Sequence, residues 1–158
     1  MLERDNGEKY EGYFYNNQFH GKGKFSYAPD DSYGQKYCMG FFEHDQLHGP
    51  GTMVWTNGDS CKCTWVYNQM EGTGTYKWAN GIKSKILLSN GEMTFEPPLI
   101  YPDEDFRKEY LGGLKNGYVM HGEGTLTLKN GKQYTGQWIA GSIAAYAEEI
   151  SSLETDWL

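Results

Sequence analysis

Hydrophobic and polar residues alternate along most of this chain, in short runs that end at asparagine or glycine. The first run covers Glu8–Tyr15, and after the turn Asn16-Asn17 a second run covers Lys22–Tyr27. Alternation over this length predicts strands with one buried face, because successive side chains of a strand point to opposite faces. Two such runs around a two-residue turn predict a β-hairpin.

The hairpins recur with a period near 23 residues, which the insertion at 28–36 lengthens after the first copy. A glycine in the first strand of each copy is followed, at constant offsets, by His-Gly-x-Gly in the second strand. Gly12 and Gly40 begin two copies, and Cys63, 23 positions after Gly40, replaces the glycine in a third. A constant period of this length predicts a repeat array in which neighbouring units share one buried surface.

Six hairpin units are expected, and the pattern breaks in specific places. Residues 28–36 form a longer loop after the first unit. The fourth unit keeps only the period, with Ile86 at the glycine position, and then reaches Pro97 and Pro98. Because proline cannot donate to a sheet ladder, strand pairing is expected to stop there.

The chain divides into four predicted segments. Residues 1–95 carry repeats with a degenerate fourth copy, and 96–106 form a linker or surface excursion rich in proline and acidic residues. Residues 107–141 return to the repeat. In 142–158 the apolar residues change to helical spacing after a suitable N-cap, which predicts a C-terminal amphipathic α-helix.

The start of the chain also carries a turn signal. Asn6-Gly7 is typical of a type I′ hairpin turn, in which both central residues have positive φ. The chain is therefore expected to begin in mid-repeat. Either Leu2 caps the array or the sequence is a fragment of a longer protein.

The repeated pattern Tyr-Glu-Gly-x-Phe-x-Asn-x-x-x-His-Gly-x-Gly-x-x-x-Tyr resembles the MORN repeat (membrane occupation and recognition nexus). The resemblance implies an all-β fold, an elongated single-layer antiparallel β-sheet with one hairpin per repeat. It also implies a mostly non-catalytic protein, because family members act in scaffolding, peptide binding, dimerisation and membrane-associated targeting. The best matches are Tyr10–Tyr27, Tyr37–Trp55, Tyr110–Leu128 and Tyr134–Trp138.

Some positions depart from the family pattern. Three residues replace the aromatic before the glycine, and two replace the glycine itself. The first group is Cys38, Cys61 and Ser84, and the second is Cys63 and Ile86.

One face of the expected sheet carries an aromatic stripe. Residues two positions before and after each glycine share that face, and the glycine leaves space for aromatic rings to close over the backbone. We expect this stripe to form the core of the sheet and, because a single layer leaves one side open, to bind a partner peptide. The candidate partner-binding residues are Tyr10, Phe14, Phe42, Trp65, Tyr110, Tyr134 and Trp138 on the stripe, and Ile143, Tyr146, Ile150, Leu153 and Trp157 on the helix.

The net charge limits the classes of partner that we expect, and the cysteine count indicates the compartment. The 158 residues include 14 Lys and Arg against 21 Asp and Glu, a net charge of −7. This charge argues against nucleic acid, which selects a basic surface. It argues more mildly against anionic membranes, because a local basic patch could still exist. Three cysteines, an odd number, indicate a reducing compartment, which leaves the cytosol, the nucleus, the interior of a cilium and an organelle matrix open. Within these, we expect an intracellular location in the cytoplasm or cytoskeleton, or in the axoneme of a cilium or flagellum.

Catalytic and metal chemistry find little support in the spacing. Repeat-equivalent histidines in successive hairpins, such as His20 and His48, should lie roughly 9–10 Å apart, too far to share one metal ion with His121 or each other. Cys61 and Cys63 lack metal-site spacing, and Cys38 lies too far from Cys61 for a disulfide, which predicts three free thiols. We expect no enzyme activity, metal, cofactor or small-molecule ligand.

Three functions therefore stand at the sequence level. The first is a scaffold or adaptor that binds proteins within a larger assembly, such as an axonemal or cytoskeletal complex. The second is a peripheral module that binds acidic phospholipids. The third is a regulatory segment of a multidomain enzyme.

Overall fold

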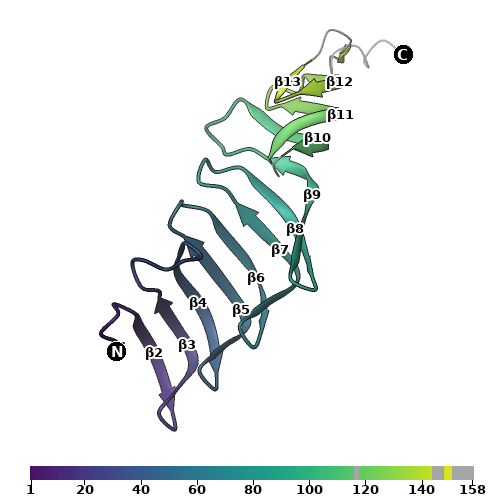
Figure 1. Cartoon of the computed structure of the whole chain (residues 1–158). Helices are drawn as coiled ribbons and strands as arrows, with labels where there is room; N and C mark the ends of the chain where they lie inside the picture. The colour runs from purple at the N-terminus through teal and green to yellow at the C-terminus, as the bar shows by residue number, and fades with distance from the viewer. Residues whose placement is uncertain (116–117, 144–147, 151–158) are drawn as a thin grey trace. The chain divides into compact units, whose positions relative to one another are not determined.

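The computed structural model describes residues 1–115, 118–143 and 148–150 (Figure 1). Every helix or strand assigned among these residues is a β-strand, which confirms the all-β class. The chain forms two compact units: unit 1 comprises residues 1–79 and 86–94, and unit 2 comprises 80–85 and the described residues from 95 onward.

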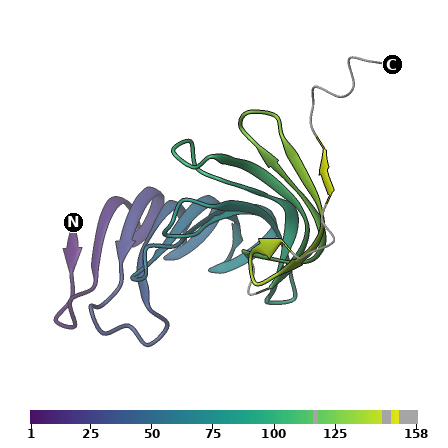
Figure 2. The same cartoon turned by 90° about the horizontal axis from the view of Figure 1, so that it is seen from above.

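Unit 1 is an open antiparallel sheet in which each strand from β1 to β7 pairs with its neighbours in sequence. Figures 1 and 2 both show its consecutive hairpins, β2/β3, β4/β5 and β6/β7, side by side. Strands β8 (Lys83–Ser89) and β9 (Glu92–Ile100) contribute residues to both units. The strands of unit 1 are β1 (Leu2–Glu3), β2 (Lys9–Tyr15), β3 (Gln18–Ser26), β4 (Gln35–Glu43), β5 (Gln46–Trp55), β6 (Ser60–Val66) and β7 (Gln69–Lys77).

The register of unit 1 aligns the repeated glycines across the sheet. Gly12 lies opposite Gly23, Gly23 opposite Gly40, Gly40 opposite Gly51, and Gly51 opposite Cys63. The sequence period therefore becomes a row that crosses five strands. This row divides each face of the sheet into two bands of side chains.

The rings of the predicted stripe close over this glycine row. A Cβ atom on Gly12 would lie 2.7 Å from Tyr10 Oη, and Tyr10 stacks on Phe19 with ring centroids 3.8 Å apart. Unit 2 repeats the arrangement, because a Cβ on Gly112 would lie 2.6 Å from Tyr110 Oη. The glycines are thus required for close approach of an aromatic ring, as the pattern predicts. Within each unit we call the face that carries this tyrosine, Tyr10 in unit 1 and Tyr110 in unit 2, the core face, and the opposite one the outer face.

Turns within a hairpin differ from turns between hairpins. Within a hairpin both turn residues have positive φ, as in Tyr67 (45°) and Asn68 (69°), which is the type I′ pattern. Between hairpins only the glycine does, as in Gly58 (92°), whose N–H donates to the Trp55 carbonyl. The prediction for Asn6-Gly7 is wrong in this respect, because only Gly7 has positive φ. A type I turn followed by a left-handed glycine replaces the type I′ turn there.

Turn residues also connect neighbouring hairpins. The Leu47 N–H donates to Asn68 Oδ1 over 2.8 Å, and the Asn68 N–H donates to the Leu47 carbonyl over 2.9 Å. Asp45 holds Phe19 in the same way, with the Phe19 N–H 2.7 Å from Asp45 Oδ1. A polar residue that tolerates positive φ therefore links two repeats as well as closing its own turn.

Unit 2 continues the antiparallel pattern through the prolines. Strand β9 extends past Pro97 and Pro98, and Leu99 lies opposite Tyr110 in β10. The expected end of pairing at the prolines is therefore wrong. Proline lacks the N–H donor, but the Glu96 carbonyl still accepts from Ser84 Oγ over 2.9 Å, and Leu99 is fully buried. The strands of this unit are β10 (Arg107–Lys115), β11 (Val119–Leu128), β12 (Gln133–Ile139), β13 (Ser142–Ile143) and β14 (Glu148–Ile150).

The loop that follows β9 is held by an ion pair. Arg107 Nη2 lies 2.6 Å from Asp105 Oδ2, and the guanidinium carbon lies 4.1 Å from the centroid of the Tyr101 ring. The hydrogen bond from Arg107 holds the pKa of the Asp105 carboxyl below its usual range. The segment expected to be a linker is thus part strand and part anchored loop.

The predicted C-terminal helix is wrong where the structure describes the chain. Ala140 and Gly141 have φ of 50° and 84°, so a type I′ turn reverses the chain onto β12. Ile143 in β13 pairs with Trp138, and Ile150 in β14 pairs with Gln133. The turn and the open edge of β12 outweigh the helical spacing, because an unpaired edge offers backbone partners to the next segment. Three of the expected helix residues, Tyr146, Leu153 and Trp157, lie outside the described residues.

Candidate protein-binding surfaces

The structure separates the candidate stripe residues by exposure. Five are buried in the core face and belong to the packing of the sheet. Phe14 is 44% exposed, and Tyr134 is half-buried. The stripe is therefore mainly core, and only its margins reach solvent. The five buried residues are Tyr10, Phe42, Trp65, Tyr110 and Trp138.

A hollow of about 410 Å³ opens on the core face of unit 1. Its polar rim includes Arg4, Gln35, Asp45 and Asn68. Two half-buried aromatic residues, Phe25 in β3 and Tyr27 just after it, make part of its wall. The candidate set omitted them, although their alternation in the second strand marks them as core-face residues. We call this the unit 1 hollow; its apolar lining is Phe19, Phe25, Tyr27, Cys38, Phe42, Leu47 and Trp65.

Burial keeps two side chains of the unit 1 hollow, Tyr27 and Cys38, uncharged. The Tyr27 hydroxyl donates to Cys38 Sγ over 3.7 Å. Desolvation by burial raises the pKa of both the Tyr27 hydroxyl and the Cys38 thiol. Both groups are therefore uncharged at physiological pH. The hollow can accept apolar or aromatic side chains, with hydrogen bonding confined to its rim.

Unit 2 has a repeat-equivalent hollow of about 270 Å³. Leu126 and Leu128 of β11 occupy the positions that Phe25, in β3, and Tyr27, just after β3, hold in unit 1, while Trp138 corresponds to Phe42. A residue from the loop, Phe106, which is 70% exposed, closes one side. We call this the unit 2 hollow; it is lined by Phe106, Leu126, Leu128, Tyr134 and Trp138.

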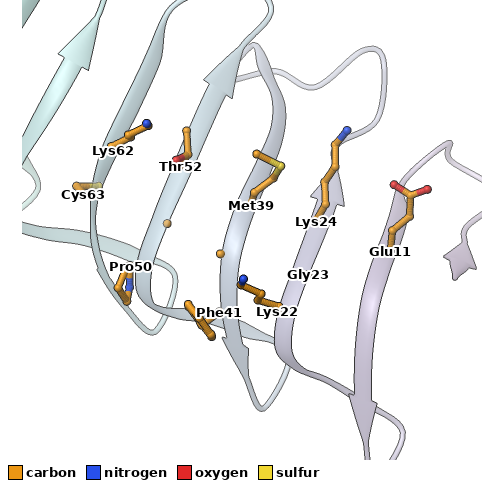
Figure 3. Close-up of a pocket in the computed structure, with 12 residues that line it drawn as sticks. Glu11, Lys22, Gly23, Lys24, Met39, Phe41, Pro50, Thr52, Lys62 and Cys63 are labelled. Atoms are coloured by element: carbon orange, nitrogen blue, oxygen red, sulfur yellow. The ribbon is translucent and has the colours of Figure 1, made fainter.

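The outer face of unit 1 carries a third depression, of about 580 Å³ (Figure 3). It crosses β2 to β6 along the glycine row, so backbone forms its floor. We call it the outer groove. Side chains line it in two bands: Glu11, Lys24, Met39, Thr52 and Lys62 in one, and Lys22, Phe41 and Pro50 in the other.

The histidine and cysteine side chains considered for metal or disulfide chemistry pack against neighbouring residues. The His48 ring lies 4.6 Å from the Tyr67 ring, and the Tyr67 N–H donates to its Nδ1. Cys38, Cys61 and Cys63 are buried free thiols, and the hydrogen bond with Cys61 raises the pKa of Cys63. The described part of the chain contains no group of three or more His, Cys, Asp or Glu placed to hold a metal ion.

The described residues also include no helix long and apolar enough to span a membrane. No curated protein matches the chain. The family model described as MORN repeat matches residues 10–32, 38–60, 64–83 and 109–133, which make up more than half of the sequence. With its aligned glycines and rings closed over them, the chain belongs to the MORN repeat family.

Proposed function

We propose that the protein is a non-enzymatic scaffold or adaptor that binds protein partners through the core face. The observation that carries this proposal is the pair of repeat-equivalent hollows, one in each unit. Each combines buried aromatic walls with side chains that reach solvent, such as Phe25 and Phe106. Apolar pockets with a polar margin are typical of sites that anchor a few side chains of a partner.

The partner in this proposal is a protein segment with exposed apolar or aromatic side chains. Apart from Arg4 and Asp45 at the rim of the unit 1 hollow, the residues that line both hollows are uncharged, so nucleic acid and charged small molecules gain little there. The buried free thiols agree with the proposed reducing intracellular location. A structural subunit of a larger assembly, such as an axonemal or cytoskeletal complex, fits a chain made mostly of repeats.

Site-specific photocrosslinking tests the core face directly. A benzoylphenylalanine at position 25 lies at the unit 1 hollow, and one at position 128 lies at the unit 2 hollow. A third, at position 13 on the outer face, is the matched control because Tyr13 is 70% exposed. The probe-bearing protein of 158 residues is then illuminated in extract from its native source.

The proposal expects crosslinked partners from positions 25 and 128 that position 13 does not give. The crosslinks from position 25 should be lost when Tyr27→Asp is introduced, and those from position 128 when Phe106→Asp is introduced, each with an unchanged unfolding midpoint. Partners crosslinked equally from all three positions, or only from position 13, would contradict binding at the core face.

A further inference from the structure

The outer groove of unit 1 has a charge opposite to that of the whole protein. Three lysines and one glutamate line it, whereas the chain carries a net charge of −7. Among the described residues, none of these three ammonium groups forms an ion pair. Lys24 lies 4.3 Å from the centroid of the Tyr37 ring, a contact that leaves its charge uncompensated. The groove therefore attracts an anionic group.

Apolar side chains separate the lysines. Met39 and Phe41 lie on β4, between Lys24 of β3 and Lys62 of β6, and are 42% and 43% exposed. Figure 3 shows Lys24 and Lys62 on either side of Met39 and Thr52, with Phe41 and Lys22 toward the other band. A ligand that fills the groove thus meets charge at two ends and apolar surface between them.

Strand spacing sets the length of this ligand. Lys24 and Lys62 are three strands apart, which at about 4.8 Å per strand is roughly 14 Å. An extended peptide advances about 3.3 Å per residue and points every second side chain to the same side. Two carboxylates four residues apart therefore span about 13 Å, and the residue midway between them faces the same surface.

We propose that the outer groove binds an extended acidic peptide segment, with carboxylates at positions i and i+4 and an apolar residue at i+2. The carboxylates lie at Lys24 and Lys62, and the apolar residue packs on Met39 and Phe41. Lys22 is available for a further acidic residue on the other band. This surface is separate from the core face, so the inference does not depend on the proposed function.

The geometry favours a peptide over an anionic bilayer. A bilayer meets the whole protein, whose net charge of −7 repels it. A short peptide meets only the groove, where lysines outnumber carboxylates three to one. Glu11 lies beyond Lys24 at the β2 end and disfavours an acidic residue there, which limits the number of carboxylates that the site accepts.

Fluorescence polarisation with the purified full chain tests this site. The probe is a labelled peptide, Gly-Glu-Ser-Leu-Ser-Glu-Gly, and the comparison peptide has its two glutamates adjacent. We expect saturable binding of the first peptide, several-fold tighter than the second, that weakens as salt rises from 50 to 500 mM. The salt effect follows from screening of exposed charges.

Charge-reversal variants test whether the peptide binds in the outer groove. Lys24→Glu with Lys62→Glu should weaken binding about tenfold or more, because each change turns an attraction into a repulsion. Lys77→Glu is the matched control: it is an exposed lysine of β7 on the same face, outside the groove, and should change affinity less than twofold. Phe25→Asp at the unit 1 hollow should also leave it unchanged.

Unfolding midpoints within 2 °C of the parent protein establish that the variants are folded. Equal affinity for the Lys24→Glu, Lys62→Glu variant and the parent would overturn the proposal. Absence of peptide binding, or lysine-dependent binding to vesicles with 30% phosphatidylserine but not to peptide, would overturn it equally. Absence of core-face crosslinks in the otherwise unchanged protein, together with intact peptide binding, would contradict the proposed function alone.

Discussion

Trp65 and Trp138 occupy the same position of the repeat in units 1 and 2, yet their indole groups differ. Both side chains are buried, at 5% and 4% exposure. The Trp138 N–H donates to the Gly124 carbonyl over 2.9 Å, whereas Trp65 Nε1 finds no acceptor among the described residues. Cys63 stands near Trp65 where Gly136 stands near Trp138. The position in the repeat thus determines where the indole ring packs, whereas the residues around the ring determine whether its N–H finds a hydrogen-bond acceptor.

The largest expected effect comes from removing either ring. Trp65→Ala and Trp138→Ala should each lower the free energy of unfolding by about 3–5 kcal/mol, because each empties a buried site. Urea unfolding followed by circular dichroism measures this. Phe41→Ala, a half-exposed aromatic on the outer face, is the control and should cost less than about 1 kcal/mol. Equal costs at all three positions would refute the distinction between the two faces.

Replacing each tryptophan by phenylalanine tests the hydrogen bond that Trp138 donates. Trp138→Phe should be more destabilising than Trp65→Phe by roughly 1 kcal/mol, because only Trp138 loses a hydrogen bond. Both changes remove similar volume, so the difference between the two unfolding free energies isolates the bond. If Trp65→Phe costs as much as Trp138→Phe, the two indoles are equivalent after all.

The turns provide a second, smaller contrast between the units. Asn68 accepts a hydrogen bond from the Leu47 N–H, whereas its counterpart Gly141 offers only its own N–H, to the Met120 carbonyl. Asn68→Gly keeps the positive φ and should cost about 1 kcal/mol through loss of the side-chain acceptor. Thermal unfolding measures it, with Asn17→Gly as a turn control.

The reciprocal change completes this contrast. Gly141→Asn places an acceptor where unit 2 lacks one, and asparagine tolerates positive φ. We expect a gain of up to about 0.5 kcal/mol in unfolding free energy. Loss of stability in Gly141→Asn would show that the link between repeats does not transfer from unit 1 to unit 2.

The smallest effect concerns pH and the anchored loop of unit 2. Because the folded pKa of Asp105 is lowered by Arg107, its contribution to stability is complete above the unfolded pKa of about 3.9 and is lost as pH falls through the folded value. Asp105→Asn should therefore destabilise the protein at pH 7 and make little difference near pH 2. Unfolding midpoints across this range measure the difference, and a constant difference would contradict the ion pair.

Local pattern predicted the hairpins well because alternation, glycine and turn residues act over a few positions. The approach of Tyr10 to Gly12 and Gly23 could be derived from their spacing. The C-terminal segment could not, because a helical spacing of Ile143 and Ile150 competes with an edge strand that is visible only once β12 is placed. The prediction that pairing ends at Pro97 was wrong for a similar reason: the missing backbone N–H matters only if a neighbouring strand offers an acceptor for it.

The amino-acid sequence by itself determined the repeat, its glycine row, the residues of its core face and the family. Tertiary structure decided which of those residues stay open to solvent, because burial depends on the side chains of neighbouring strands. It also decided the outer groove. Lys24 and Lys62 are far apart in sequence, and only the register of four adjacent strands brings them to opposite ends of one surface.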